Sequence, residues 1–140
     1  MRRNRLIVLA LAGVAGAIAL GAVARPPVWA QAQPGLWEID GLPGAKSPIR
    51  QCVADLGALA QFEHRGKGCS PRAISSSASS TIVEYSCGSA GFGRSEVAAI
   101  TPRALRIETQ GISAQLPFSY VLQARRIGDC PQQAAPPSRH

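Results

Sequence analysis

The sequence predicts a mainly β domain, a single antiparallel meander sheet of about six or seven strands, flat or curled, with one short helix and two disulfides. Three observations predict this class. Several segments alternate between apolar and polar residues, which is the period of a strand with one buried face. Clusters of Gly, Pro and Ser separate these segments. The four cysteines, an even number, suit a small exported domain braced by disulfides.

The first 30 residues are typical of a secretory signal peptide. Three arginines lie within residues 1–5, residues 6–24 carry no charge, and Val28 and Ala30 occupy the −3 and −1 positions of a small-residue cleavage site. We therefore expect cleavage after Ala30 and a periplasmic or secreted product. Because residues 6–24 approach the length of a membrane span, retention of this segment as an inner-membrane anchor is the alternative.

The predicted mature domain spans residues 31–130, and residues 131–140 form a tail that we expect to be disordered. Four of the fifteen Lys and Arg residues leave with the signal peptide, so eleven bases face eight acids and the net charge falls from +7 to about +3. The remaining bases are scattered along the chain, whereas nucleic acid binding needs a clustered basic face with aromatic neighbours. We expect no nucleic-acid partner, and a membrane partner only if the N-terminal segment is uncleaved.

Residues 69–87 carry the clearest strand-pairing signal. A three-residue loop at Ser77–Ser79 would set one register for the whole hairpin. Four pairs then face each other: Cys69 and Cys87, Arg72 and Glu84, Ile74 and Ile82, and Ser75 and Thr81. Opposite charges and matched apolar residues directly across an antiparallel pair are both favourable. Directly opposed residues also lie about 4.5 to 5.5 Å apart, within the range of a disulfide.

This register favours a disulfide between Cys69 and Cys87, which leaves Cys52 for Cys130. The alternative pairs Cys52 with Cys69 and Cys87 with Cys130, and it stays open because connectivity does not follow from sequence alone. Both pairings imply an oxidising compartment. A four-cysteine metal site would need close pairs such as C-x-x-C, but these cysteines are 17, 18 and 43 residues apart.

The remaining segments supply further strands and the helix. Residues 36–40 place Trp37 and Ile39 on one face, and residues 49–53 form a short second strand. A two-turn helix is predicted over residues 55–62, where Asp55 is the capping residue.

Two more segments complete the sheet. A turn at Pro102 and Arg103 would pair two neighbouring strands. The expected partners there are Ile100 with Leu105 and Ala98 with Ile107. The last strand, over residues 116–127, has four residues on its apolar face: Phe118, Tyr120, Leu122 and Ala124. We expect Arg125 to be solvated, and Arg126 either to reach past the edge of the sheet or to pair with Asp129.

Five short motifs stand in order along the chain. They are PGLWEI at 34–39, CVADL at 52–56, GC at 68–69, YSC at 85–87 and RRIGDC at 125–130. Together they resemble a family of small exported bacterial proteins, the domain of unknown function 3617 family, over residues 34–130. The resemblance implies an envelope location and brings no activity, catalytic residue or ligand. Members often carry a methionine-dotted segment after the first motif, but the only methionine here is Met1, so we expect no thioether metal site.

No set of residues in the sequence predicts catalysis. Ser89 lies in CGSAG, which lacks the first glycine and the following helix of a nucleophile elbow. The glycine-rich GSAGFG lacks the lysine of a phosphate loop and is typical of a hairpin turn. His64, in a polar loop, is expected to be solvated and has no second imidazole for zinc. We therefore expect no catalytic residue, no cofactor and no metal site.

The candidate binding residues are Trp37, Phe118 and Tyr120. Inward-facing aromatics of this kind form a core or line a groove for a small apolar ligand. The predicted function is a non-catalytic binding or envelope-associated module, with an envelope protein or a small apolar ligand as its partner. Two alternatives are an inhibitor of an envelope hydrolase and a weak hydrolase that uses paired carboxylates.

Overall fold

The computed structural model describes residues 28–131. The strands are β1 (Gly35–Asp40), β2 (Ile49–Val53), β3 (Ser70–Ser76), β4 (Ser80–Ser86), β5 (Gly91–Thr101), β6 (Ala104–Ser113) and β7 (Leu116–Gly128). The helical segments are α1 (Val28–Gln31), α2 (Gly57–Ala60) and the 3-10 turns η1 (Phe62–His64) and η2 (Gly88–Ala90). The predicted mainly β class is confirmed. The predicted signal peptide up to residue 27, its anchor alternative and the predicted tail from residue 132 lie outside the described residues.

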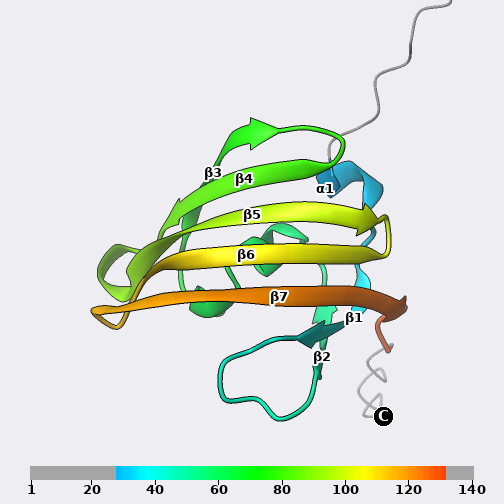
Figure 1. Cartoon of the computed structure of the whole chain (residues 1–140), viewed down its shortest axis with the longest axis horizontal. Coiled ribbons are helices and arrows are strands. Elements are labelled where there is room, and N and C mark those ends of the chain that lie inside the picture. The colour runs from blue at the N-terminus through cyan, green and yellow to red at the C-terminus, as the bar shows by residue number, and fades with distance from the viewer. Residues whose placement is uncertain (1–27, 132–140) are drawn as a thin grey trace, which may run out of the picture.

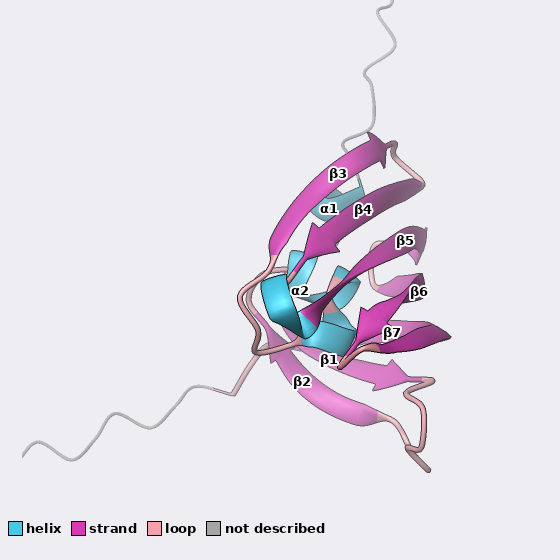
Figure 2. Ribbon diagram, turned by 90° about the vertical axis from the view of Figure 1, so that its left-hand side faces the viewer, coloured by secondary structure: helices cyan, strands magenta, loops and turns pink. Residues whose placement is uncertain are grey.

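All seven strands form one open antiparallel sheet in the order β2-β1-β7-β6-β5-β4-β3 (Figure 1). Strands β3 to β7 follow the chain as a meander, and the β1–β2 hairpin joins on the far side of β7. Consecutive strands β2 and β3 therefore lie at opposite edges of the sheet. The chain between them carries α2 and η1, and the sheet curls around these helical turns (Figure 2).

The core lies between the inner face of the sheet and the helical turns. The largest fully buried side chains of the sheet include Trp37, Ile39, Ile107 and Leu122. Leu59 and Phe62 pack against them from the helical side. The predicted inward faces of β1 and β7 are thus confirmed. Each side chain of this size stabilises the fold by roughly 1.5 to 3 kcal/mol when fully buried.

The predicted helix is shorter than residues 55–62 and breaks at Gln61, whose φ and ψ are −109° and 25°. The N-cap residue of α2 is Leu56 and not Asp55 as predicted, although the Asp55 carboxylate accepts a hydrogen bond from the backbone N–H of Gly57 at 2.8 Å. In an unbroken α-helix Leu59 and His64, five residues apart, would point about 140° away from each other. The break turns both side chains into the interior, where they are 1% and 3% exposed.

The β3–β4 hairpin confirms part of the predicted register. The loop is Ser77–Ser79, and Arg72 pairs with Glu84 as expected. A bulge after Ala73 then shifts the remaining pairs by one residue. Ser75 faces Ile82 and Ser76 faces Thr81, so the predicted Ile74–Ile82 and Ser75–Thr81 pairs are wrong. The shift brings the hydroxyls of Ser76 and Thr81 within 3.0 Å of each other and satisfies the fully buried Thr81.

The loop of this hairpin needs no glycine. The Ser77 hydroxyl oxygen accepts hydrogen bonds from the backbone N–H groups of Ser79 and Ser80 at 3.3 and 3.1 Å. Such a side-chain turn closes the loop with ordinary backbone angles. None of the three loop residues has a positive φ.

The β5–β6 hairpin repeats this pattern. Its turn at Pro102 and Arg103 is confirmed, because Thr101 pairs with Ala104. A bulge at Ile100 then shifts the register, so the predicted partners are wrong. The observed pairs are Ala99 with Leu105, Ala98 with Arg106 and Val97 with Ile107. The shift buries Val97 completely and leaves Ile100 64% exposed.

Both favoured disulfides are present, and the alternative connectivity is wrong. Cys69 and Cys87 close the open end of the β3–β4 hairpin, with a Cα–Cα distance of 4.1 Å. Cys52, in β2, is joined to Cys130, just after β7, across 78 residues of sequence. Two disulfides and no free cysteine indicate an oxidising, extracytoplasmic environment.

Candidate functional site

The best candidate site is a hollow of about 860 Å³ on the outer face of strands β3 to β7, the face that points away from the helical turns. Three rows of residues, each running directly across these strands, form it. The polar row is Arg72, Glu84, Arg94, Gln110 and Ser119. The central row is Pro71, Tyr85, Gly93, Gly111 and Phe118. The end row is Ser70, Ser86, Phe92 and Ile112.

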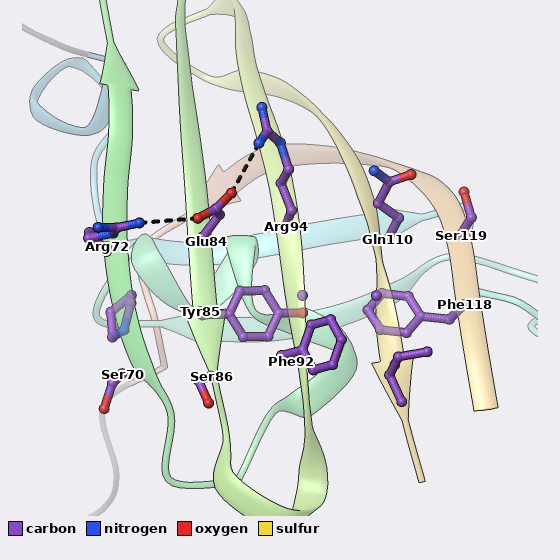
Figure 3. A pocket seen from close by; sticks show the side chains of 14 residues that line it. Ser70, Arg72, Glu84, Tyr85, Ser86, Phe92, Arg94, Gln110, Phe118 and Ser119 are labelled. Carbon is purple, nitrogen blue, oxygen red and sulfur yellow. Dashed lines mark hydrogen bonds and ion pairs between the residues drawn. The ribbon is translucent and has the colours of Figure 1, made fainter. Parts of the chain in front are cut away.

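The central row forms the floor of the hollow. Gly93 and Gly111 lie next to each other in the sheet, between Tyr85 and Phe118. The Tyr85 ring packs so closely under Gly93 that a Cβ atom there would overlap its hydroxyl oxygen. A Cβ atom at Gly111 would overlap the backbone of Phe92. The sheet therefore has no side chain at these two neighbouring positions, and the rings of Tyr85 and Phe118 pack against it there (Figure 3).

The polar row carries a net positive charge. The guanidinium groups of Arg72 and Arg94 flank the Glu84 carboxylate at N–O distances of 3.4 and 3.0 Å (Figure 3). The two arginine side chains are 76% and 48% exposed, so the ion pairs lie in solvent and stabilise the fold little. Their effect is to hold two guanidiniums on either side of one carboxylate, along one rim of the hollow.

The end row carries an unusually exposed aromatic ring. Phe92 is 55% exposed, and its cross-strand neighbour Ile112 extends the apolar surface towards Pro117. An apolar surface rimmed by polar residues is typical of an interaction site. Ser70 and Ser86 continue the row beyond Phe92 and complete the rim (Figure 3).

His64 braces the floor from the inner side of the sheet. Its Nε2 atom lies 3.1 Å from the carbonyl oxygens of both Ala90 and Ile112, and Nδ1 lies 3.3 Å from the Tyr85 hydroxyl. Carbonyl oxygens only accept, so Nε2 carries the proton and Nδ1 accepts from Tyr85. Burial is the main cause that raises the pKa of Tyr85, which favours the neutral, donating hydroxyl.

The prediction that His64 is solvated is therefore wrong. The residue is 3% exposed and makes edge contacts with the rings of Tyr85 and Phe118, at centroid distances of 5.5 and 5.8 Å. Polar neighbours in the sequence suggested a surface loop. The partners of His64 lie 21 to 48 residues away along the chain, so no local signal could have identified its position.

The three predicted binding aromatics have different positions. Trp37 is fully buried in the core and does not reach a binding surface. Phe118 is half-buried and borders the hollow. Tyr120 is half-buried on the other side of Phe118, where it borders a second cavity of about 960 Å³ together with Glu63. The sequence therefore predicted one residue of the hollow, while Phe92 and Arg94 were missed.

Tyr120 and Glu63 form the main polar contact of the second cavity. The Tyr120 hydroxyl donates a hydrogen bond to the Glu63 carboxylate at 2.8 Å. Burial raises the pKa of Tyr120 well above its usual range, and the neighbouring Glu63 carboxylate raises it further. Glu63 is the one acidic residue that lines this cavity. A carboxylate pair of the kind used in glycoside hydrolysis is therefore not present there.

Two other carboxylates do lie together, on the outer face of the sheet. Glu96 and Glu108 are direct cross-strand partners in β5 and β6, and both are exposed. Glu108 forms an ion pair with Arg106. Within residues 28–131, no group of three His, Cys, Asp or Glu side chains lies close enough to hold a metal ion. Over the same range, no helix is long and apolar enough to cross a membrane.

Comparisons with known protein families, with curated proteins and with solved structures find no match for this chain. The hollow and the two disulfides are therefore the features of this molecule that indicate its function.

Proposed function

We propose that this protein is a non-catalytic binding module of the bacterial envelope, and that the hollow binds a small amphipathic anion. The single observation that carries the proposal is the placement of Phe92, a half-exposed ring, in the same hollow as the guanidiniums of Arg72 and Arg94, on the opposite side of the central row. The apolar body of the ligand would cover Phe92 and Ile112, and its anionic group would meet the arginines.

Three physical arguments support this ligand class. The volume of the hollow, about 860 Å³, lies within the range of about 300 to 1,000 Å³ that is usual for small-molecule sites. Two guanidiniums against one carboxylate leave a positive charge for an anion. A guanidinium has five N–H donors in a planar fork, which suits a carboxylate or phosphate, and Glu84 accepts one hydrogen bond from each arginine.

The floor supports binding because it is fixed before the ligand arrives. The His64 contacts hold Tyr85 beneath Gly93, and the Cys69–Cys87 disulfide ties the two strands that carry Arg72 and Glu84. A prearranged site loses less conformational entropy on binding. The two disulfides also support the envelope location, since such bonds persist in oxidising compartments.

Calorimetric titration of the oxidised protein with decanoate, below its micelle concentration, tests the proposal. We expect saturable binding of decanoate and weaker binding of decanol, which has the same chain without the charge. Phe92→Ala should weaken binding about fivefold, because the ligand buries the exposed half of the ring, roughly 1 kcal/mol. Arg94→Gln should reduce the preference for decanoate over decanol.

Ile100→Ala is the matched control. Ile100 is also in β5 and is 64% exposed, but it lies outside the hollow, so its substitution should leave binding unchanged. Decanoate that does not saturate would overturn the proposal, as would an equal loss of affinity in the Phe92→Ala and Ile100→Ala variants.

A further inference from the structure

The helix α1 is part of the folded domain. Val28 is fully buried in the core, and Ala32, just after α1, is 4% exposed. The backbone N–H of Val28 donates to the Ser77 carbonyl oxygen at 3.2 Å, and the Gln31 side chain donates to the Ala78 carbonyl oxygen at 2.8 Å. These contacts attach α1 to the tip of the β3–β4 hairpin.

Cleavage after Ala30 is incompatible with this arrangement. It would remove Val28 from the core and divide the four-residue α1 before its last residue. The loss of a buried apolar side chain leaves a cavity and destabilises a domain. A mature chain that begins at Gln31 would also lose the hydrogen bond from Val28 to Ser77. The mature N-terminus should therefore precede Val28.

The sequence contains a second small-residue cleavage site upstream. Ala22, Val23 and Ala24 form an A-x-A motif at the end of the uncharged segment 6–24, directly before Arg25. Small residues at the −3 and −1 positions are the pattern that signal peptidases recognise. This motif stands four residues before Val28, so cleavage there leaves α1 intact.

We propose that the processing site is the peptide bond between Ala24 and Arg25. A signal peptidase would hydrolyse this bond, so that water supplies the hydroxyl of the new Ala24 carboxyl group and a proton to the new Arg25 amine. Of the printed sequence, the 116 residues from Arg25 to His140 would remain. Three of fifteen bases leave with the leader, and twelve bases against eight acids give a net side-chain charge of about +4.

This inference rests on the export that the proposed function includes, and one experiment separates the two. The full chain is expressed in a secreting bacterial host, and the intact mass and N-terminal sequence of the exported protein are determined. We expect an N-terminus at Arg25. An N-terminus at Gln31 would overturn the inference and leave export standing. A full-length chain that begins at Met1 and stays in the cytoplasmic fraction would overturn both, whereas a full-length chain held in the inner membrane would overturn the inference alone.

Variants make the test sharper. Ala24→Gln places a large side chain at the −1 position and should slow processing, whereas Ala30→Gln, an exposed position, should not. Val28→Ala keeps a small residue at the −3 position of the Ala30 site, so it would permit cleavage there. If Val28 is retained, the exported Val28→Ala protein should have a Tm several degrees lower than the parent. Identical Tm values would contradict the inference.

Discussion

At the scale of single residues, His64 connects three parts of the chain that are distant in sequence. It lies in η1 and contacts the turn at Ala90, the end of β6 at Ile112 and the Tyr85 ring in β4. A buried carbonyl oxygen that loses its donor is left without a hydrogen bond and keeps its full desolvation cost. The loss of His64 should therefore destabilise the fold by more than the free energy of the hydrogen bonds that it makes. It also fixes the ring on which the floor of the hollow depends.

Substitution of His64 tests this role. His64→Ala leaves a cavity and removes the donor to two carbonyl oxygens, so we expect the free energy of unfolding to fall by about 2 to 3 kcal/mol. Lys67→Ala, three residues later at an exposed position, is the control and should change it by less than about 0.5 kcal/mol. Urea unfolding followed by tryptophan fluorescence measures both. A His64→Ala variant as stable as the Lys67→Ala variant would contradict the role assigned to the ring.

At the scale of the elements, the hairpins differ in how their turns are made. Ala114 and Gln115, between β6 and β7, have φ values of 48° and 66°. Among the described residues these are the only non-glycine residues with a positive φ. Two consecutive residues of this kind match a type I′ turn, which Asn-Gly adopts with least strain. The β3–β4 loop avoids this strain through the Ser77 hydroxyl.

This difference predicts opposite effects of glycine in the two turns. The double substitution Ala114→Asn and Gln115→Gly should raise the free energy of unfolding by about 1 kcal/mol, because it removes the steric strain of the left-handed conformation. Ala78→Gly in the β3–β4 loop should lower it slightly, since it only adds freedom to the unfolded chain. Thermal unfolding of both variants checks the signs. An increase in Tm for Ala78→Gly would contradict this explanation of the turns.

The elements also show what the sequence could and could not predict. Alternation identified the strands and their inward faces, and turn residues located two hairpin turns correctly. Both registers then failed by one residue at a bulge, beside Ile74 and at Ile100, because a period of two assumes that every residue has a partner. The bulges are favoured because they satisfy the buried Thr81 hydroxyl and bury Val97. Both effects depend on packing against distant parts of the chain.

The candidate site was harder to predict than the fold for a related reason. Phe92 lies between two glycines, and this stretch was interpreted as a turn, although Gly91 to Gly93 begin β5. The Arg72–Glu84 pair is predicted as a structural contact, but Arg94, which completes the polar row, comes from β5, and no register of β5 against β4 is predicted. A site built across five strands becomes visible only when all their registers are known.

At the scale of the whole molecule, the two disulfides close loops of very different lengths. Their partners are 78 and 18 residues apart. In the chain-entropy model, a longer closed loop lowers the conformational entropy of the unfolded chain more. Here the model gives a stabilisation of about 4.5 kcal/mol for the longer loop and about 3 kcal/mol for the shorter one. The longer one also connects a strand at the edge of the sheet to the C-terminal end of the domain.

Removal of each disulfide should therefore have unequal effects. The double variant Cys52→Ser and Cys130→Ser should lose more free energy of unfolding than the matched variant Cys69→Ser and Cys87→Ser. Urea unfolding of the two variants and the parent, under identical conditions, measures the difference. An equal or larger loss in the Cys69 and Cys87 variant would show that local constraints of the hairpin outweigh loop length.

The pairing of β1 with β7 governs the order in which the domain can be completed. Whether the chain leaves a ribosome or a secretion pore, β1 emerges early and the strand it pairs with, Leu116–Gly128, emerges last. The meander from β3 to β7 can pair as it appears, and β1 can pair with β2, but the edge of β1 that faces β7 has no partner strand until the end. Contacts between distant parts of a sequence form slowly. The last step of folding, the pairing of β1 with β7, can therefore take place only after nearly the whole polypeptide has emerged.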